Sequence, residues 1–238
     1  MNWKEYKAVY NAKIRKVPVH ATLMGEFYNR YVSIYMTFVM FKAKLSANFV
    51  TVLSFLSLII GMVVINTGRG IIIYLIHIVL LQLSAVIDIV DGQIARLNNT
   101  SSKYGKFLDL ALDRVNLFAL YIGYGLALFR DGDLDSPGKV LLFTFGSLAY
   151  IYYCELGLVR SIVYSDLSGT MQNLRGDWRS LFMKIPYQFI HLNVVLFIYS
   201  IGYSLSWGYA TIVIYGIFAA IMCVAQITYI FITHKKSA

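Results

Sequence analysis

The amino-acid sequence predicts an all-α integral membrane protein, with six transmembrane helices preceded by an amphipathic interfacial helix. Of its 238 residues, 58% are hydrophobic and only 14% are charged. A soluble domain of this length would carry far more charge. In addition, apolar stretches of roughly 20 residues, the length that crosses a bilayer, follow one another along the chain. Composition therefore favours a membrane protein.

The expected elements are justified in chain order. Residues 1–20 are a basic arm, and residues 21–44 mix charged and aromatic residues, which favours a helix lying in the membrane interface, with a tilted span as the alternative. Residues 45–234 are expected to form one transmembrane domain. Its six apolar spans are predicted at about 48–67, 71–95, 105–129, 139–164, 185–206 and 208–233.

The basic residues predict the orientation of these spans. They gather in the N-terminal arm, after the second span, after the fourth span and in the C-terminal tail, which all fall on one side of a six-span protein. The positive-inside rule places that side, with both termini, in the cytoplasm. The net charge of +9 is then explained by contact with anionic membrane lipids and phosphorylated substrate, and no nucleic-acid partner is expected.

Four aspartates interrupt the apolar pattern where the second span ends and the third begins. Asp88 and Asp91 are three residues apart, and Asp109 and Asp113 are four apart, so each pair shares one helix face. Two antiparallel helices can present all four carboxylates to one cavity. Oxygen ligands without His or Cys suit Mg²⁺ or Mn²⁺. Two such ions would clamp a phosphoryl group, with the site at the cytoplasmic end.

Small residues and one arginine accompany the acids. Gly92, Ala95 and Gly105 remove side-chain bulk beside the carboxylates and let a ligand approach the backbone. Arg96 offers a planar fork that suits phosphate. A lone aspartate is commonly a helix cap and a lone glycine commonly a packing residue. The whole set at fixed spacing instead indicates a nucleotide–metal site.

This set resembles the signature of the CDP-alcohol phosphotransferases. The pattern D-x-x-D-G-x-x-A-R, then eight residues, then G-x-x-x-D-x-x-x-D, has every signature position filled. The resemblance covers about residues 21–234. The segment LSANFVT is also similar to the "TPN-x-x-T" stretch of that family. Asn48 and Thr51 match it, while Ser46 and Ala47 replace the usual Thr and Pro.

The resemblance implies a reaction and a set of roles. A CDP-alcohol donates its substituted phosphate to the hydroxyl of an acceptor alcohol, and CMP leaves, in phospholipid or phospho-polyol biosynthesis. It implies two Mg²⁺ or Mn²⁺ ions held by Asp88, Asp91, Asp109 and Asp113, with Asp91 essential for turnover and Asp113 the candidate general base. A homodimer is also implied. The residues expected to line the nucleotide are Asn48, Thr51, Gly92, Ala95, Arg96 and Gly105.

The two substrates are less sharply indicated. Gln82-x-Ser84, Leu108-Asp109 and Asp113-Arg114 resemble the inositol-phosphate type, which uses soluble CDP-inositol. The alternative is a CDP-diacylglycerol-dependent synthase with a serine or glycerol phosphate acceptor. Arg160 and Arg179 are expected to bind an anionic acceptor, with a purely topological role as the alternative.

Two other classes of function compete with a transferase. A divalent-cation transporter also places carboxylates in a membrane, but its acids would spread across the membrane depth, and it would not need Arg96 beside them. A membrane scaffold has no reason to keep paired acids beside Gly92 and Gly105. His77 and His191, on apolar spans, are expected to pack rather than bind metal.

Overall fold

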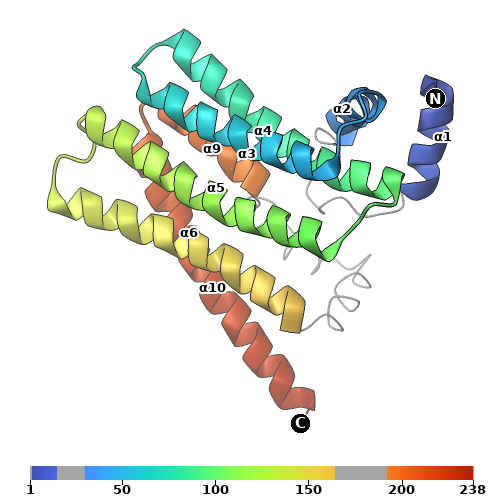
Figure 1. Ribbon diagram of the computed structural model, residues 1–238. Coiled ribbons are helices and arrows are strands. Elements are labelled where there is room, and N and C mark those ends of the chain that lie inside the picture. The colour runs from blue at the N-terminus through green and yellow to red at the C-terminus, as the bar shows by residue number, and fades with distance from the viewer. Residues whose placement is uncertain (1, 15–29, 164–191, 238) are drawn as a thin grey trace. The chain divides into compact units, whose positions relative to one another are not determined.

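The computed structural model describes residues 2–14, 30–163 and 192–237, and every regular element within these ranges is a helix. The predicted all-α class is therefore confirmed for the described residues (Figure 1). The described helices are α1 Trp3–Lys13, α2 Arg30–Lys42, α3 Ala47–Asn66, α4 Ile71–Asn98, α5 Lys103–Arg130, α6 Pro137–Val163, α9 Leu192–Ser204 and α10 Gly208–Ser237.

Five of the described helices are long and apolar enough to cross a membrane. Their candidate spans are Ala47–Asn66, Ile71–Asn98, Lys103–Arg130, Pro137–Gly157 and Gly208–Thr228. A shorter apolar stretch, Val194–Ser204, lies in α9. The six-span count stays a prediction, because the expected fifth span begins at about residue 185 and residues 164–191 lie outside the described part. α2 covers residues 30–42 of the expected interfacial helix, and its place in an interface also stays a prediction.

The chain divides into two compact units. The first contains Met1–Ala127 and His191–Ser200, and the second contains Leu128–Ile190 and Ile201–Ala238. All four aspartates lie in the first unit. The single domain expected over residues 45–234 stays a prediction.

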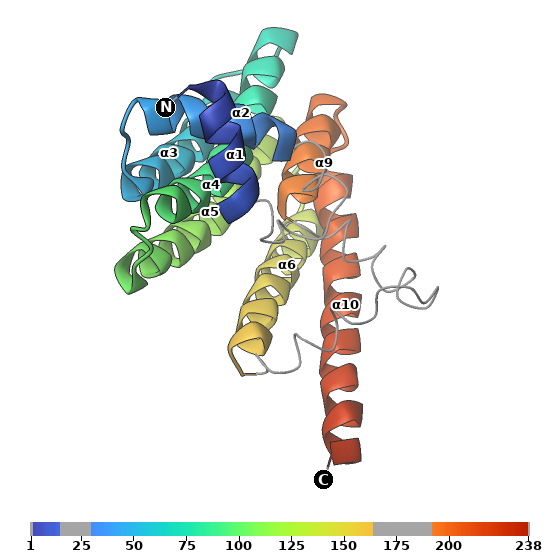
Figure 2. The ribbon, with the colours of Figure 1, turned by 90° about the vertical axis from the view of Figure 1, so that its right-hand side faces the viewer.

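In the first unit, α3 and α4 pack side by side and antiparallel (Figures 1 and 2). Ser46 caps α3 by accepting a hydrogen bond from the Phe49 N–H at 3.3 Å. Gly61 allows the close approach, since a Cβ there would lie 2.6 Å from Leu81 Cδ1. Ser54 and Ser84 fasten the pair reciprocally, because each hydroxyl donates to the other's carbonyl, at 3.0 and 2.9 Å.

A buried polar chain fixes α2 against α4. Thr37 donates to Gln93 Oε1 at 2.6 Å, and Gln93 Nε2 donates to Ser33 Oγ at 3.0 Å. All three side chains are fully buried. A buried polar group without a partner costs about 1–3 kcal/mol, so these three hydrogen-bonded side chains specify one position of α2 on α4. Gln93 lies two residues beyond Asp91 along α4.

A second buried network joins four helices deeper in the first unit. His77 contacts the Gly61 carbonyl through Nδ1 at 2.9 Å and the Tyr124 hydroxyl through Nε2 at 3.0 Å. The Tyr124 hydroxyl lies 3.4 Å from Ser200 Oγ on α9. His77 is fully buried, so the structure shows it as a packed, hydrogen-bonded residue, as the sequence suggested. His191 lies outside the described residues.

In the second unit, α6 packs on α10 through two glycines. A Cβ built on Gly216 would lie only 2.0 Å from the Gly146 Cα, so neither position accepts a side chain in this geometry. α6 begins at Pro137, where a missing N–H costs nothing, after Ser136. Between α5 and α6, the Asp131 carboxylate accepts hydrogen bonds from Arg130 and from the Tyr203 hydroxyl.

Replacing His77 by Leu is expected to destabilise the protein by about 1–3 kcal/mol. The change removes one partner from each of two buried groups, the Gly61 carbonyl and the Tyr124 hydroxyl. The measurement is the unfolding transition of the purified protein in detergent. Ile76→Leu is the control, because this neighbour on α4 is 46% exposed and should change stability little. Equal stability of the two variants would show that the network contributes nothing.

Candidate functional site

Three of the four aspartates come together between α4 and α5. One carboxylate oxygen from each of Asp88, Asp109 and Asp113 lies within 4.8 Å of the others, and all three residues are half-buried. The antiparallel register explains the meeting. His77 contacts Tyr124, and these residues lie eleven positions before Asp88 and eleven after Asp113. Eleven residues are about three helical turns. The residues of the Asp88–Asp113 pair therefore lie on the same facing sides of α4 and α5 as those of the His77–Tyr124 pair.

Asp91 lies beside this group and is held from the α3 side. Its side chain is buried, with 6% of the residue exposed, and its Oδ2 accepts a hydrogen bond from Thr51 at 2.5 Å. It still interacts electrostatically with Asp109 and Asp113. Three helices thus supply the acidic site. The Thr51 hydroxyl is thus engaged by Asp91, and the predicted role of Thr51 as a nucleotide contact stays a prediction.

Arg96 folds back over Gly92. Its two terminal nitrogens lie 3.4 Å from the place a Gly92 Cβ would occupy. Its Nε is buried without a hydrogen-bond partner. Gly92 therefore leaves room for a guanidinium that still has a donor to offer. Ala95, in the same turn, accepts the backbone hydrogen bonds of Asn99 and Thr100 where α4 ends.

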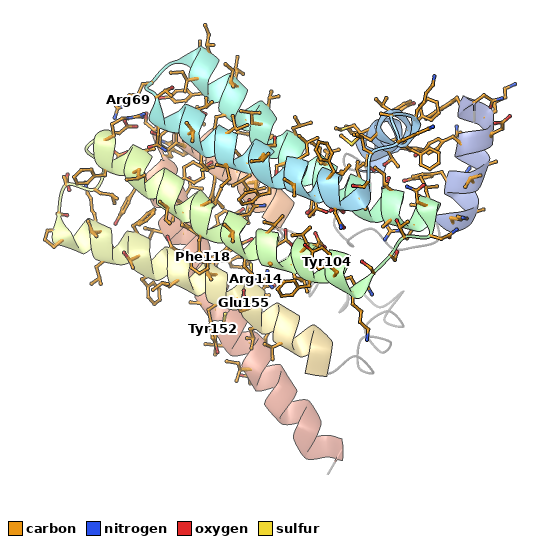
Figure 3. The ribbon with its side chains drawn as sticks, viewed as in Figure 1. Arg69, Tyr104, Arg114, Phe118, Tyr152 and Glu155 are labelled. Atoms are coloured by element: carbon orange, nitrogen blue, oxygen red, sulfur yellow. The ribbon has the colours of Figure 1, made fainter. Side chains whose placement is uncertain are left out.

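The beginnings of α3 and α5 meet at Gly105. A Cβ on Gly105 would lie 3.3 Å from both Asn48 Oδ1 and Ser102 Oγ, which is tighter than usual contact. All six expected nucleotide residues therefore lie near one end of the first unit. Figure 3 labels Tyr104 beside Gly105 at this end, and Arg69 in the turn between α3 and α4 at the opposite end.

The remaining predicted residues are placed differently. Ser84, which belongs to the pattern that suggests the substrate type, donates a hydrogen bond from α4 to the Ser54 carbonyl of α3. Gln82 is buried, and its Nε2 has no hydrogen-bond partner. Arg160 lies on α6, but its side chain lies outside what the structure describes. Arg179 also lies outside the described residues. The acceptor roles of these two arginines stay predictions.

The chemistry of the acidic group fits a divalent cation. Three carboxylates whose oxygens lie within 4.8 Å repel one another, and the helices that carry them are apolar enough to span a membrane. A cation between them removes the repulsion. The donors are oxygens from Asp alone, the set preferred by Mg²⁺ and Mn²⁺. The acids also gather at one end of α4 and α5 rather than along a path.

Sequence reasoning missed several residues around this site. The sequence predicts a basic arm over residues 1–20 and no helix within it, whereas Trp3–Lys13 form α1. A signal was present, because Asn2 and Glu5 are spaced as a capping box, and the structure shows both of its hydrogen bonds. Gln93 and its partners on α2 gave no such signal, since a pairing across 56 residues leaves no local pattern.

Comparison with known proteins identifies the family. A family model described as CDP-alcohol phosphatidyltransferase matches residues 44–231, which include the four aspartates, Gly92, Arg96 and Gly105. No curated protein matched the chain. The family consists of metal-dependent transferases of phosphate-containing groups that use a CDP-alcohol and an alcohol acceptor. With a match over most of its length and a cluster of carboxylates suited to metal, the chain belongs to the CDP-alcohol phosphatidyltransferase family.

Proposed function

We propose that this protein transfers the substituted phosphate of a CDP-alcohol to the hydroxyl of an acceptor alcohol, releasing CMP, at a divalent-metal site on α4 and α5. The observation that carries the proposal is the meeting of Asp88, Asp109 and Asp113 within 4.8 Å. Asp91 lies beside them, bound to Thr51. Bound Mg²⁺ or Mn²⁺ would polarise the phosphoryl group and stabilise the charge that develops on it.

All four acids would hold the two proposed ions. The three clustered carboxylates would supply oxygens from α4 and α5, and Asp91, which Thr51 of α3 binds, would supply another. The Thr51 hydroxyl occupies one oxygen of Asp91 and so fixes which way the carboxylate points. Such an outer partner orients a metal ligand.

The donor nucleotide is held by the surrounding small residues and by Arg96. The terminal nitrogens of Arg96 lie over Gly92, and its buried Nε has no hydrogen-bond partner, so the guanidinium can turn toward a phosphate. Gly105 and Asn48 lie against each other at the same end and are the proposed nucleotide contacts from α5 and α3. Ala95 and Thr51 complete the proposed donor site.

Asp113 is the proposed general base. It takes the proton of the acceptor hydroxyl as that oxygen attacks the phosphorus joined to CMP. The bond between this phosphorus and the CMP oxygen breaks, and its electron pair leaves with CMP. Proton uptake by a positioned carboxylate requires that the acceptor hydroxyl lie within hydrogen-bond reach of Asp113.

For the substrates, we propose the inositol-phosphate type with soluble CDP-inositol, and a CDP-diacylglycerol-dependent synthase as the second candidate. Arg160 and Arg179 are the proposed acceptor contacts, and a homodimer in the membrane with the site facing the cytoplasm is the proposed assembly. Mass spectrometry of the products formed from several CDP-donors and a lipid extract identifies the pair. A product carrying diacylglycerol would replace the first candidate by the second.

Removing the metal or one of its ligands is expected to abolish transfer. Excess chelator should stop CMP release, and Mg²⁺ or Mn²⁺ should restore it. Asp109→Asn should lower turnover by roughly a hundredfold or more, because a charge-stabilising group is lost. Asp135→Asn is the matched control, since Asp135 is an exposed acid that pairs with Lys139 in the second unit. Unchanged CMP release in chelator would refute the metal site.

Substitutions at Gly92 are expected to act by displacing Arg96. Gly92→Ala should be tolerated, because its Cβ would lie 3.4 Å from the guanidinium. Gly92→Leu should push the guanidinium away and raise the donor KM by about ten- to a hundredfold, the value of a charge-assisted contact. Gly138→Leu is the control, since nothing lies within 4 Å of its Cβ. Equal donor KM values for Gly92→Ala and Gly92→Leu would count against a donor site here.

The two ends of the first unit are expected to face opposite sides of the membrane. In a variant without Cys154 and Cys223, Lys103→Cys should react with an impermeant thiol reagent from the cytoplasmic side only. Arg69→Cys, at the opposite end and also exposed, should react from the other side only (Figure 3). Labelling of both positions from one side would contradict the predicted topology.

A further inference from the structure

A pocket of about 340 Å³ lies where the C-terminal ends of α2 and α4 meet. It is lined by two aromatic rings, two lysines and an amide, from Phe38, Phe41, Lys42, Lys44 and Asn98. Its volume falls within the range of ligand sites, roughly 300–1,000 Å³. Among the described residues that line it, two are positively charged and none is acidic. The pocket therefore suits an anionic group that also carries apolar surface.

Packing holds the aromatic wall of this pocket in place. Phe38 and Phe41 pack against a cluster of buried residues from the α1 segment and α4, namely Tyr6, Tyr10, Ile14 and Leu97. The Thr37 hydroxyl, beside Phe38 in the chain, donates to Gln93 of α4. α2 is thus fixed on α4, and the pocket between their ends is formed in advance. A site formed in advance loses less entropy when a ligand binds.

Lys44 occupies a backbone position that glycine would fill more favourably. Its N–H donates to the Phe41 carbonyl at 3.0 Å. The Leu45 N–H donates to the Met40 carbonyl at 3.1 Å. These two bonds form the Schellman motif, whose next-to-last residue adopts the left-handed conformation and is usually glycine. Lys44 has a φ of 56°, where a Cβ is disfavoured. Its side chain thus lowers stability here while it supplies one of the two charges of the pocket.

An exposed apolar stripe on α2 leads toward the pocket. Tyr31, Tyr35 and Val39 are 61–66% exposed, and they recur every fourth residue, so they lie along one side of the helix. Lys42 follows on this side at the next turn. Exposed tyrosine is typical of the membrane–water interface, where its ring meets lipid and its hydroxyl meets water. The stripe therefore indicates that the anionic group in the pocket belongs to a lipid.

We propose that this pocket binds the phosphate of an anionic membrane lipid, with Lys42 and Lys44 as its charged contacts and the acyl chains along the exposed stripe of α2. The pocket lies at the end of α4 that is predicted to face the cytoplasm, where anionic lipids attract basic segments. None of its residues belongs to the proposed donor or acceptor sites, so this inference stands apart from the reaction. The competing explanation is that Lys42 only complements the dipole of α2 and that both lysines only orient the protein.

The first test measures lipid binding to the full-length protein in detergent, with excess chelator so that no divalent metal takes part. Bound dioctanoyl phosphatidylglycerol is counted by native mass spectrometry. Dioctanoyl phosphatidylcholine, which has no net charge, and inorganic phosphate, which has no acyl chains, are the competitors. Phosphatidylglycerol should bind saturably, and each competitor should bind about tenfold more weakly or worse. Equal binding of inorganic phosphate would reveal a site for soluble anions, and equal binding of phosphatidylcholine would show that the charges are unused. Either result overturns the proposal.

Substitution of Lys44 separates lipid binding from folding. Lys44→Gly should weaken phosphatidylglycerol binding about fivefold, because one charge near the membrane surface is lost. It should also raise the unfolding temperature by about 2–4 °C, because glycine relieves the left-handed backbone. A residue with only a structural role would not weaken binding while stabilising the fold. Lys42→Gln should weaken binding by a similar factor.

Lys7→Gln is the matched control, because it removes one exposed charge of α1 that does not line the pocket. Its affinity for phosphatidylglycerol should equal that of the parent protein. The proposal is overturned if Lys44→Gly and Lys42→Gln bind this lipid as tightly as the parent does. It is also overturned if Lys7→Gln loses as much affinity as they do, since the attraction would then come from the general positive charge of this end.

Discussion

The group formed by Asp88, Asp109 and Asp113 sets the strictest demand on this structure. Its oxygens lie within 4.8 Å of one another between helices that are apolar enough to span a membrane. Like charges at such separations repel, and the low dielectric strengthens the repulsion. Rigid packing must therefore keep α4 and α5 from separating, and a bound cation would relieve the repulsion. The His77–Tyr124 contact, three turns deeper, supplies part of that packing.

Hydrogen bonds between helices recur through the first unit for a common physical reason. Lipid tails are as apolar as Leu or Ile, so burial against a neighbouring helix gains little over burial in lipid. Close approach and polar contacts must specify the arrangement instead. Gly61 allows α3 to approach α4, Ser54 and Ser84 fasten them, and Gln93 holds α2.

The sequence predicted that the acids come together, and three of them do, because the information for this meeting is local. The spacing of Asp88 and Asp91 fixes a shared helix face, and a short connection brings Asp109 and Asp113 alongside. Contacts across long separations could not be read in this way. The bond from Thr51 to Asp91 joins residues 40 apart, and that from Thr37 to Gln93 joins residues 56 apart. The helix α1 was not predicted for another reason: its sequence is polar and basic, and the capping box at Asn2 was overlooked.

The buried hydrogen bonds from Gln93 to Ser33 and Thr37 also constrain the order in which the helices pack during synthesis. Ser33 and Thr37 of α2 are translated 60 and 56 residues before Gln93. Until α4 has been synthesised, their partner in the folded protein is absent. α2 therefore docks after two later helices have entered the membrane, and α1 can complete its contacts only when Leu97 has arrived. The first segments translated are among the last to reach their final positions.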